Sequence, residues 1–574
     1  MKRICIFLSL ICFAAILPAQ DHLWVFFTDK GDDAACRLQT PESFLSAEAI
    51  ARKQAQGIRL TEQDLPVHTD YLQTLQASGV QIVSTSRWLN AAVIKRSAKA
   101  ESLMQLDFVK GVRTVGVLVQ NKAEIADEDL AAVVEEPLRG TPFMYGRARH
   151  QNDMLTIAPL HERGISGHGV RIAVFDAGFK GADTIEAFDS LRLQNRLIAV
   201  RDFVDNDDEV YHASSHGTHV LSTIAANMPG KMVGMAPHVS VLLARTEDAR
   251  SETRQEEHNW VKAVEWADSV GVDIIHSSLG YALFDTDEES YEYSNMDGNT
   301  TIITKAADMA AARGIIVTVS AGNEGSHPWR HITAPCDADS VLCIGSVDRY
   351  SKHSLFSSIG PSADGRVKPD VVAMGSMTTV ASPNNRISRS NGTSFSGPLI
   401  AGFVACLVEA HPKRSNMEII QAVRLSGDQY VFPDEKYGYG IPNATFADSL
   451  LANVENLAEV SINMEAKPQR GRPTIAATKP KETVLRFKPK FTENPTTVMT
   501  QTESVIKLLN TESPIRSLKV MKGKQQIVLD PSSIKIAGSG KKAKIKTKYL
   551  LPDDYYLVIK LGDKEELIPF KVSE

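Results

Sequence analysis

Short apolar runs alternate with amphipathic runs through the middle of the chain. The runs Val170–Phe175 and Ile315–Val319 are typical of buried strands, and Asn259–Ser269 and Thr301–Arg313 are typical of helices. A parallel sheet covered by helices on both faces requires this alternation. Residues 145–451, about 300 residues, can bury one large core. The pattern therefore predicts a single α/β domain over residues 145–451.

A smaller region of strands and helices precedes this domain, over residues 21–117. When a first helix at 46–56 is set aside, its order is β-α-β-β-α-β. Residues 118–144 are acidic in their first half and are expected to form an exposed linker. The elements predicted in residues 21–117 are strands at 23–27, 81–84, 91–94 and 112–115 and helices at 69–76 and 99–106.

The composition changes after residue 451. Lys, Arg, Pro and Thr dominate residues 467–490, which indicates a solvated linker over 452–503. Residues 504–574 are again rich in strand-like runs separated by turn signals, which predicts a small all-β sandwich. Its expected strands are 505–509, 517–521, 526–529, 543–547, 555–561 and 566–572.

The first 20 residues have the features of a secretory signal peptide. Lys2 and Arg3 precede an almost continuous apolar run from Ile4 to Leu17. A membrane anchor is the alternative, but this run is shorter than the roughly 20 residues that a span needs. We therefore expect a secreted protein, extracellular or on the cell surface, with no integral membrane segment after signal removal.

Charge and cysteine use narrow the class further. The net charge of −6 over 574 residues is too small to imply a polyanionic partner, and the basic linker has no interleaved aromatic residues, so nucleic acid is not expected. Cys336 and Cys343 flank a short turn and can form a disulfide outside the cell, with two free thiols as the alternative. Cys406 lies in an apolar helix and is expected to be buried and inert. No metal-ligand spacing of Cys or His is present, so no metal site is assigned.

Three residues are candidates for nucleophilic chemistry. Ser394 precedes an apolar helix at 399–409, and the unpaired N–H groups and positive dipole of a helix start favour negative charge there. Asp176 ends a buried strand, where open α/β sheets place their sites. His216 opens a helix of small residues, and His219 is a rival base. Other nearby carboxylates are better explained as solvated loop residues or a cation site: Asp202, Asp205, Asp207 and Asp208.

Four short blocks in this order resemble those of the subtilisin-type serine proteases, the subtilase family. They are Val174-Phe175-Asp176-Ala177-Gly178, His216-Gly217-Thr218-His219-Val220, Ser320-Ala321-Gly322-Asn323-Glu324-Gly325 and Gly392-Thr393-Ser394-Phe395-Ser396-Gly397-Pro398. The chain order Asp, His, Ser is that of subtilisin. The resemblance implies a subtilisin-like parallel sheet and a serine endopeptidase that needs no cofactor for its chemistry.

The resemblance also implies the roles of these residues. Ser394 would be the nucleophile, His216 the general base and Asp176 the residue that orients the imidazole. Asn323 would donate to the oxyanion, although it can also be read as support for a glycine-rich turn. Ser278, Leu279 and Gly280 resemble the strand that pairs with an extended peptide substrate and lines the first specificity pocket.

Three positions depart from the usual family pattern. His276 stands where most relatives have asparagine, and Gly397 stands where alanine is commoner. Ala177 follows the aspartate where threonine or serine is usual, which removes a hydroxyl that can bond Asp176. None of the three changes removes a proposed catalytic group, so we expect activity.

The flanking regions also resemble known modules. Residues 21–117 are similar to the ferredoxin-like inhibitory propeptide of subtilases, which assists folding and blocks the cleft until it is cut; a small separate binding domain is the alternative. The last strands resemble the C-terminal sorting domain of the Bacteroidetes type IX secretion system, whose machinery would then be a partner. Asp554 stands where glycine is usual, and a stabilising or substrate-binding β-domain is the alternative. Calcium often stabilises relatives, but no complete oxygen-ligand loop is readable.

The sequence therefore predicts an exported, self-processed subtilisin-like endopeptidase that acts on proteins or peptides. An esterase or peptide ligase that uses the same triad is a second hypothesis, because a triad activates any acyl carbon. A non-catalytic adhesin on the same scaffold is a third. The complete set of Asp176, His216, Asn323 and Ser394 argues against the adhesin, because a binding module does not need all four.

Overall fold

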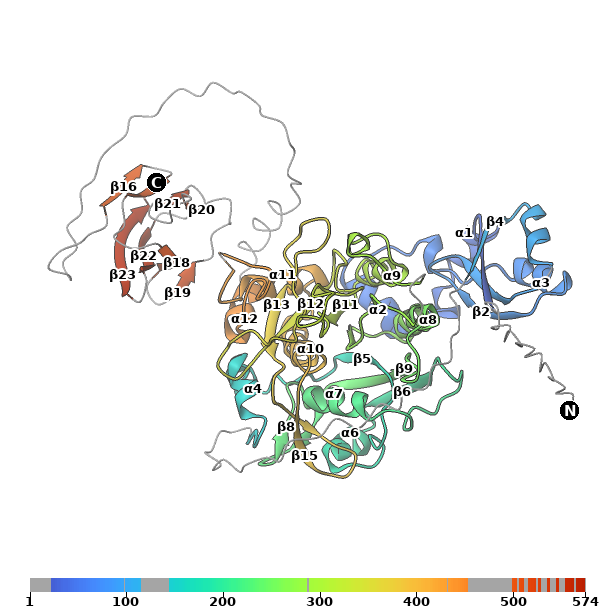
Figure 1. The fold of residues 1–574 in the computed structure, drawn as a ribbon, viewed down its shortest axis with the longest axis horizontal. Helices are drawn as coiled ribbons and strands as arrows, with labels where there is room; N and C mark the ends of the chain where they lie inside the picture. Colours follow the sequence, from blue (N-terminus) through green and yellow to red (C-terminus); the bar gives the residue numbers. More distant parts are fainter. Residues whose placement is uncertain are drawn as a thin grey trace, which may run out of the picture.

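The computed structural model describes residues 22–114 and 144–452, apart from residues 98, 286–288 and 431, and beyond them only the strands between residues 498 and 572. The predicted signal peptide, and almost all of the predicted linkers at 118–144 and 452–503, lie outside the described residues. Figure 1 shows the described parts coloured along the sequence.

A seven-stranded sheet forms the centre of residues 144–452, in the order β13-β12-β11-β10-β5-β9-β6. Every pair of neighbouring strands in it is parallel. This is the parallel α/β sheet that the alternating pattern predicts. The strands are β5 (Arg171–Asp176), β6 (Leu197–Asp202), β9 (Ser240–Arg245), β10 (Ile274–Ser277), β11 (Ile316–Ser320), β12 (Leu342–Val347) and β13 (Val371–Met374).

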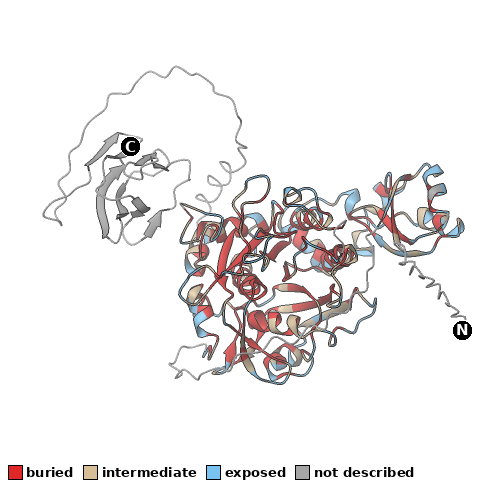
Figure 2. Cartoon of the chain, in the orientation of Figure 1, coloured by how far each residue is buried: buried red, intermediate tan, exposed pale blue. Residues whose placement is uncertain are grey.

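Helices cover both faces of this sheet, because side chains alternate between its faces along each strand. Ile172 and Val174 of β5 join the core under α7 and α10, whereas Ala173 and Phe175 join the core under α8 and α9. Figure 2 shows that both layers are buried. The first layer holds α7 (His216–Ala225), α10 (Thr393–Ala410), α11 (Asn416–Leu425) and α12 (Ala444–Ala452); the second holds α8 (Arg254–Val270) and α9 (Ile302–Ala311).

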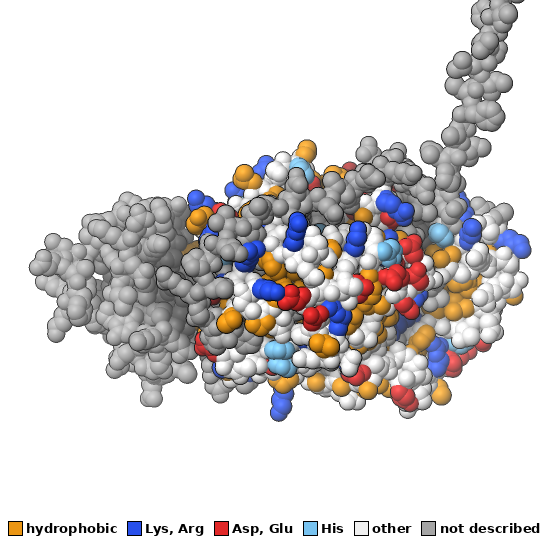
Figure 3. Space-filling view, turned by 90° about the horizontal axis from the view of Figure 1, so that it is seen from below, with side chains coloured by type: hydrophobic (Ala, Val, Ile, Leu, Met, Phe, Trp, Pro, Cys, Tyr) orange, Lys and Arg blue, Asp and Glu red, His pale blue; other side chains and the backbone are white. Residues whose placement is uncertain are grey.

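Shorter elements complete this part of the chain. They are α4 (Arg149–Met154), α5 (Ala158–Glu162), the 3-10 helix η4 (Glu186–Phe188), α6 (Asp189–Leu193), the 3-10 helix η5 (Tyr293–Asn295) and the hairpins β7 (Asn227–Met228) with β8 (Met232–Val233) and β14 (Thr378–Ala381) with β15 (Ile387–Ser390). Among the described residues, α10 is the one helix long and apolar enough to cross a membrane, and it is buried in the core. On the face in Figure 3, acidic and basic side chains are interspersed among uncharged ones.

Residues 22–114 form an α+β unit with the element order that the sequence predicts. Its antiparallel sheet has the order β2-β3-β1-β4. The helix expected at 99–106 is instead a 3-10 helix, η3 (Ala100–Gln105). The other elements are β1 (His22–Phe27), α1 (Ala34–Arg37), η1 (Pro41–Ser43), α2 (Ala47–Ala55), η2 (Glu62–Asp64), α3 (Thr69–Ala77), β2 (Ile82–Ser86), β3 (Ala91–Lys95) and β4 (Val109–Thr114).

The described C-terminal strands pair into two sheets, β16-β17-β21-β20 and β19-β18-β22-β23. All six strands predicted there are present. β16 lies within the segment that the sequence assigned to the linker, and β20 was also not expected. The strands are β16 (Val498–Thr502), β17 (Val505–Leu509), β18 (Ile515–Lys522), β19 (Gln525–Ile527), β20 (Ile534–Ile536), β21 (Ala543–Lys546), β22 (Asp553–Leu561) and β23 (Lys564–Val572).

Candidate active site

Asp176 and His216 meet at the carboxyl end of the central strand β5. Asp176 is its last residue and is fully buried. His216 Nδ1 lies 2.9 Å from Asp176 Oδ1 and 3.0 Å from Oδ2. Because a carboxylate only accepts, Nδ1 carries the proton of the neutral imidazole, and Nε2 is left as the acceptor. The backbone N–H of Ala177 donates to Asp176 Oδ1 at 2.8 Å, so the carboxylate keeps a second donor although residue 177 has no hydroxyl.

Ser394 lies in the first turn of α10, which begins at Thr393. The chain enters the helix through Gly392, whose φ of 148° is a conformation that side chains disfavour. Phe395, the next residue, packs its ring against that of His216, with centroids 5.7 Å apart. The structure therefore brings the histidine and the start of the serine helix to the same end of the sheet.

Asn323 lies in the turn after β11 and is bonded to the same helix start. Its Oδ1 accepts from the backbone N–H of Thr393 at 2.9 Å and from Thr393 Oγ1 at 3.0 Å. These two donors fix which end of the amide is oxygen. Nδ2 is therefore a donor near Gly392, where a Cβ would lie 3.7 Å from it.

The segment Ser278–Gly280 follows β10 and lies beside Ser394. Ser278 Oγ donates to the carbonyl oxygen of Ser394 at 3.1 Å, and Ser394 Oγ lies 3.5 Å from the carbonyl oxygen of Ser278. Sequence reasoning missed Thr333, which closes this region from the other side. A Cβ built on Gly280 would lie 2.1 Å from Thr333 Oγ1. Thr333 is 4% exposed, and its hydroxyl has no hydrogen-bond partner among the described residues.

Two groups of side chains in the described residues could in principle ligate a cation. In the first, Asp202 and Asp205 contact the guanidinium of Arg245 at 2.6 and 2.5 Å, beside His212. Asp202 is therefore buried in an ion pair and is not the solvated loop residue that the sequence suggested. The guanidinium already supplies the positive charge of this group.

The second group consists of Glu247 and Glu252, from the loop between β9 and α8, and Glu256, from the first turn of α8. Burial raises the pKa of Glu247 to about 8 and that of Glu256 to about 11. Tyr281 donates to Glu247, and Glu256 accepts from the backbone N–H of Thr253 at 2.8 Å as part of the capping box of α8. Near neutral pH these carboxyls are therefore largely protonated, which lowers the cost of burying them together.

The cysteines are arranged as follows. Cys336 and Cys343 form a disulfide, with Cα atoms 4.9 Å apart. Cys36 is exposed, and Cys406 is buried in α10. Burial raises the pKa of the Cys406 thiol well above its usual range, which makes this thiol unreactive.

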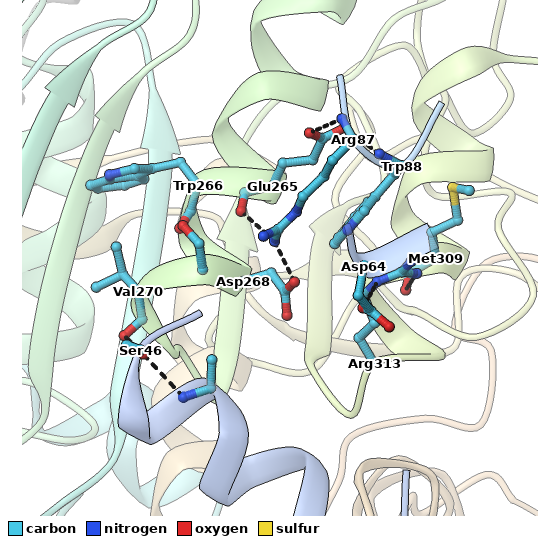
Figure 4. Close-up of polar contacts among 12 residues, drawn as sticks. Ser46, Asp64, Arg87, Trp88, Glu265, Trp266, Asp268, Val270, Met309 and Arg313 are labelled. Atoms are coloured by element: carbon cyan, nitrogen blue, oxygen red, sulfur yellow. Dashed lines mark hydrogen bonds and ion pairs between the residues drawn. The ribbon is translucent and has the colours of Figure 1, made fainter. Parts of the chain in front are cut away.

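Residues 22–114 dock on α8 through buried charges, which Figure 4 shows. Glu265 accepts from the backbone N–H of Arg87 at 2.8 Å and from Ser86 Oγ. The Asp268 side chain is fully buried, and its carboxylate pairs with Arg52 and Arg87. A second buried carboxylate, that of Asp64, pairs with Lys53 and with Arg313 of the other unit.

Family models and known relatives match two parts of the chain. Residues 167–440 match the model of the subtilase family, Peptidase S8, and residues 22–129 match that of the Peptidase S8 propeptide domain of Bacteroidota. Subtilisin NAT of Bacillus subtilis subsp. natto is 30% identical over 292 residues, 50% of this chain and 68% of that protein. A subtilisin of Bacillus pumilus is 30% identical over 292 residues, 50% of this chain and 94% of that protein. The epidermin leader peptide processing serine protease of Staphylococcus aureus is 18% identical with a TM-score of 0.49, covering 68% of this chain and 98% of that one.

The chain belongs to the subtilase family of serine proteases. It is a subtilisin-like serine endopeptidase that carries an N-terminal propeptide of the Bacteroidota type, so it is made as a zymogen.

Proposed function

We propose that Asp176, His216 and Ser394 are the catalytic triad of this endopeptidase. The observation that carries the proposal is the contact between the Asp176 carboxylate and His216 Nδ1. Because the proton of the neutral ring is on Nδ1, Nε2 can accept a proton. Nε2 then takes the proton of Ser394 Oγ as this oxygen attacks the scissile carbonyl, and later gives it to the leaving amine. Asp176 stabilises the imidazolium that forms between these steps.

Asn323 Nδ2 and the backbone N–H of Ser394 are the proposed donors to the oxyanion. The anchoring of Asn323 Oδ1 on Thr393 supports this, because it holds the amide rigid beside the nucleophile. One such donor contributes about 2.7–4 kcal/mol of barrier reduction, a magnitude that comes from subtilisin itself. In the second half of the reaction, His216 takes a proton from a water molecule, which attacks the acyl-enzyme. The ester bond to Ser394 then breaks, and His216 returns the proton to Ser394 Oγ.

Ser278, Leu279 and Gly280 are the proposed substrate-binding residues. Their position directly after β10 and beside Ser394 suits main-chain pairing with an extended peptide, which gives affinity with little demand on sequence. Thr333 limits the space behind Gly280. Because such pairing suits any extended main chain, proteins and peptides are the proposed substrates.

The domains have the following proposed roles. Residues 21–117 act as an intramolecular inhibitor and folding aid, supported by their buried contacts with α8, and 118–144 contain the maturation site. The signal at residues 1–20 directs export, so the enzyme is extracellular or on the cell surface. Residues 504–574 form a β-sandwich, which the two sheets of described strands support. Its engagement of the type IX secretion machinery is proposed from the sequence resemblance of its last strands alone.

The test compares wild-type chain with Ser394→Ala and, as a matched control, Ser396→Ala. Ser396 lies on the same helix, is fully buried and donates to the carbonyl of Thr393 at 3.1 Å. Intact mass and casein digestion are measured for each. Wild type and the control should lose an N-terminal segment of propeptide size and digest casein, whereas Ser394→Ala stays long and inert. Equal processing and digestion by Ser394→Ala would refute the assignment.

A further inference from the structure

The carbonyl of Ser394 lacks its usual helical partner. In an α-helix this carbonyl accepts from the N–H four residues later, but residue 398 is proline and has no N–H. An unpaired buried carbonyl is costly. Ser278 Oγ supplies the missing donor at 3.1 Å. The backbone of the proposed nucleophile is therefore held by the side chain of Ser278, the residue that follows β10.

His276 in turn holds Ser278. Its Nε2 lies 2.7 Å from Ser278 Oγ, and its Nδ1 lies 3.0 Å from Thr318 Oγ1 on the next strand. Since the single hydroxyl proton of Ser278 goes to the Ser394 carbonyl, Nε2 must be the donor to Ser278. Nδ1 of the neutral ring then accepts from Thr318 Oγ1, whose single proton has the carbonyl oxygen of Ile275, at 3.2 Å, as its other acceptor. The donors point in one direction, from Thr318 through His276 and Ser278 to Ser394, and such chains strengthen one another.

Burial keeps this ring neutral. His276 is fully buried, and burial lowers its pKa to about 3. When the imidazolium forms on His216, its charge opposes protonation of His276 as well. A neutral ring places no fixed charge beside the imidazolium that forms on His216 during the reaction.

Gly397 leaves the space that this ring fills. A Cβ on residue 397 would lie 2.7 Å from His276 Cε1 and 2.8 Å from Ser320 Oγ, closer than real Cβ atoms come. Ser320 Oγ is itself fixed, because it donates to the carbonyl of Thr393 at 2.9 Å. Two of the three departures from the family pattern, histidine for asparagine at 276 and glycine for alanine at 397, are therefore in direct contact.

We propose that His276 is a positioning residue for the nucleophile Ser394, acting through Ser278, and that Gly397 is the small residue its ring requires. The inference rests on the proposed function of Ser394. It assigns no proton transfer to His276, which sets the position of the Ser394 backbone and thereby of its Oγ.

The test uses His276→Asn, Gly397→Ala and the double variant, each expressed as the full chain and allowed to mature. For each we measure the melting temperature and the kcat and KM on a peptide amide. Each single change should lower kcat by about tenfold or more with KM changed less than about threefold, because misplacement of a reacting atom acts on the chemical step. The double variant, which restores the usual family pair, should recover kcat to within about threefold of wild type.

Two results overturn the inference. One is single variants that keep wild-type kcat although they melt earlier, which is what a role in core packing alone gives. The other is a double variant no better than the poorer single one. If either single variant does not fold, Ser278→Ala replaces it, since it removes the link without changing core volume much; unchanged kcat there overturns the inference too. Ser394→Ala run alongside separates the two proposals, because activity in that variant overturns the proposed function itself.

Discussion

Asp268→Asn tests how strongly the propeptide is held by buried charge. The Asp268 carboxylate is 0% exposed, and the Arg52 side chain that pairs with it is 4% exposed. Arg87 pairs with the other oxygen, and Lys53 Nζ lies 3.8 Å from the first. All three cations come from residues 22–114, and Lys53 pairs with Asp64 as well. The Asp268 carboxylate of α8 is therefore the shared counter-charge of the two buried arginines of the propeptide.

Asparagine keeps the volume of this side chain but leaves the arginines buried without their counter-charge. Removing one partner of a buried ion pair costs about 3–5 kcal/mol. Since each 1.4 kcal/mol is a factor of ten, the propeptide should bind its own catalytic domain at least roughly a hundredfold more weakly. The loss arises from desolvation, so it should persist at high salt, unlike that of a surface pair.

The assay is urea unfolding of the full chain in the Ser394→Ala background, which prevents self-cleavage. Asp189→Asn is the matched control, because Asp189 pairs with Arg192 while its side chain is 56% exposed, and surface pairs are worth about 0–1 kcal/mol. We expect a much lower unfolding midpoint for Asp268→Asn than for the control. Equal midpoints for the two variants would refute the reasoning.

Three further predictions concern the active-site region. Asn323→Ala should lower kcat by about a hundredfold to a thousandfold with little change in KM, since the donor acts on the oxyanion; an equal rise in KM would contradict that role. Thr333→Gly should raise kcat/KM for peptides with a large residue before the scissile bond relative to small ones, because Thr333 Oγ1 fills the space behind Gly280; an unchanged ratio would show that Thr333 does not limit the pocket. Burial raises the pKa of Glu247 to about 8, so the protonated carboxyl stabilises the fold below its usual pKa near 4.5 and this stability is lost as the pH rises through about 8. Glu247→Gln should therefore raise the melting temperature at about pH 9 relative to wild type more than at about pH 5, and an equal difference at both would count against it.

Much of the candidate site could be predicted from the sequence. Asp176, His216, Asn323 and Ser394 each lie at the end of a strand or the start of a helix, and local apolar patterns predict where these elements begin and end. Parallel strands then bring these ends to one edge of the sheet. Thr333 could not be predicted in this way, because it contacts Gly280, which is distant in sequence and carries no side chain to mark the contact.

The sequence by itself determined the α/β class, the order of the elements and the residues of the proposed triad, since these depend on periodicity and on short motifs. Only the tertiary structure decided which residues from distant segments share one environment. Arg52 and Asp268 are 216 positions apart, yet they form one buried pair. His276 and Gly397 were two separate departures in the sequence, and packing makes them a single unit. Such pairings depend on how whole elements pack, and a local pattern holds no information about the opposite side of a contact.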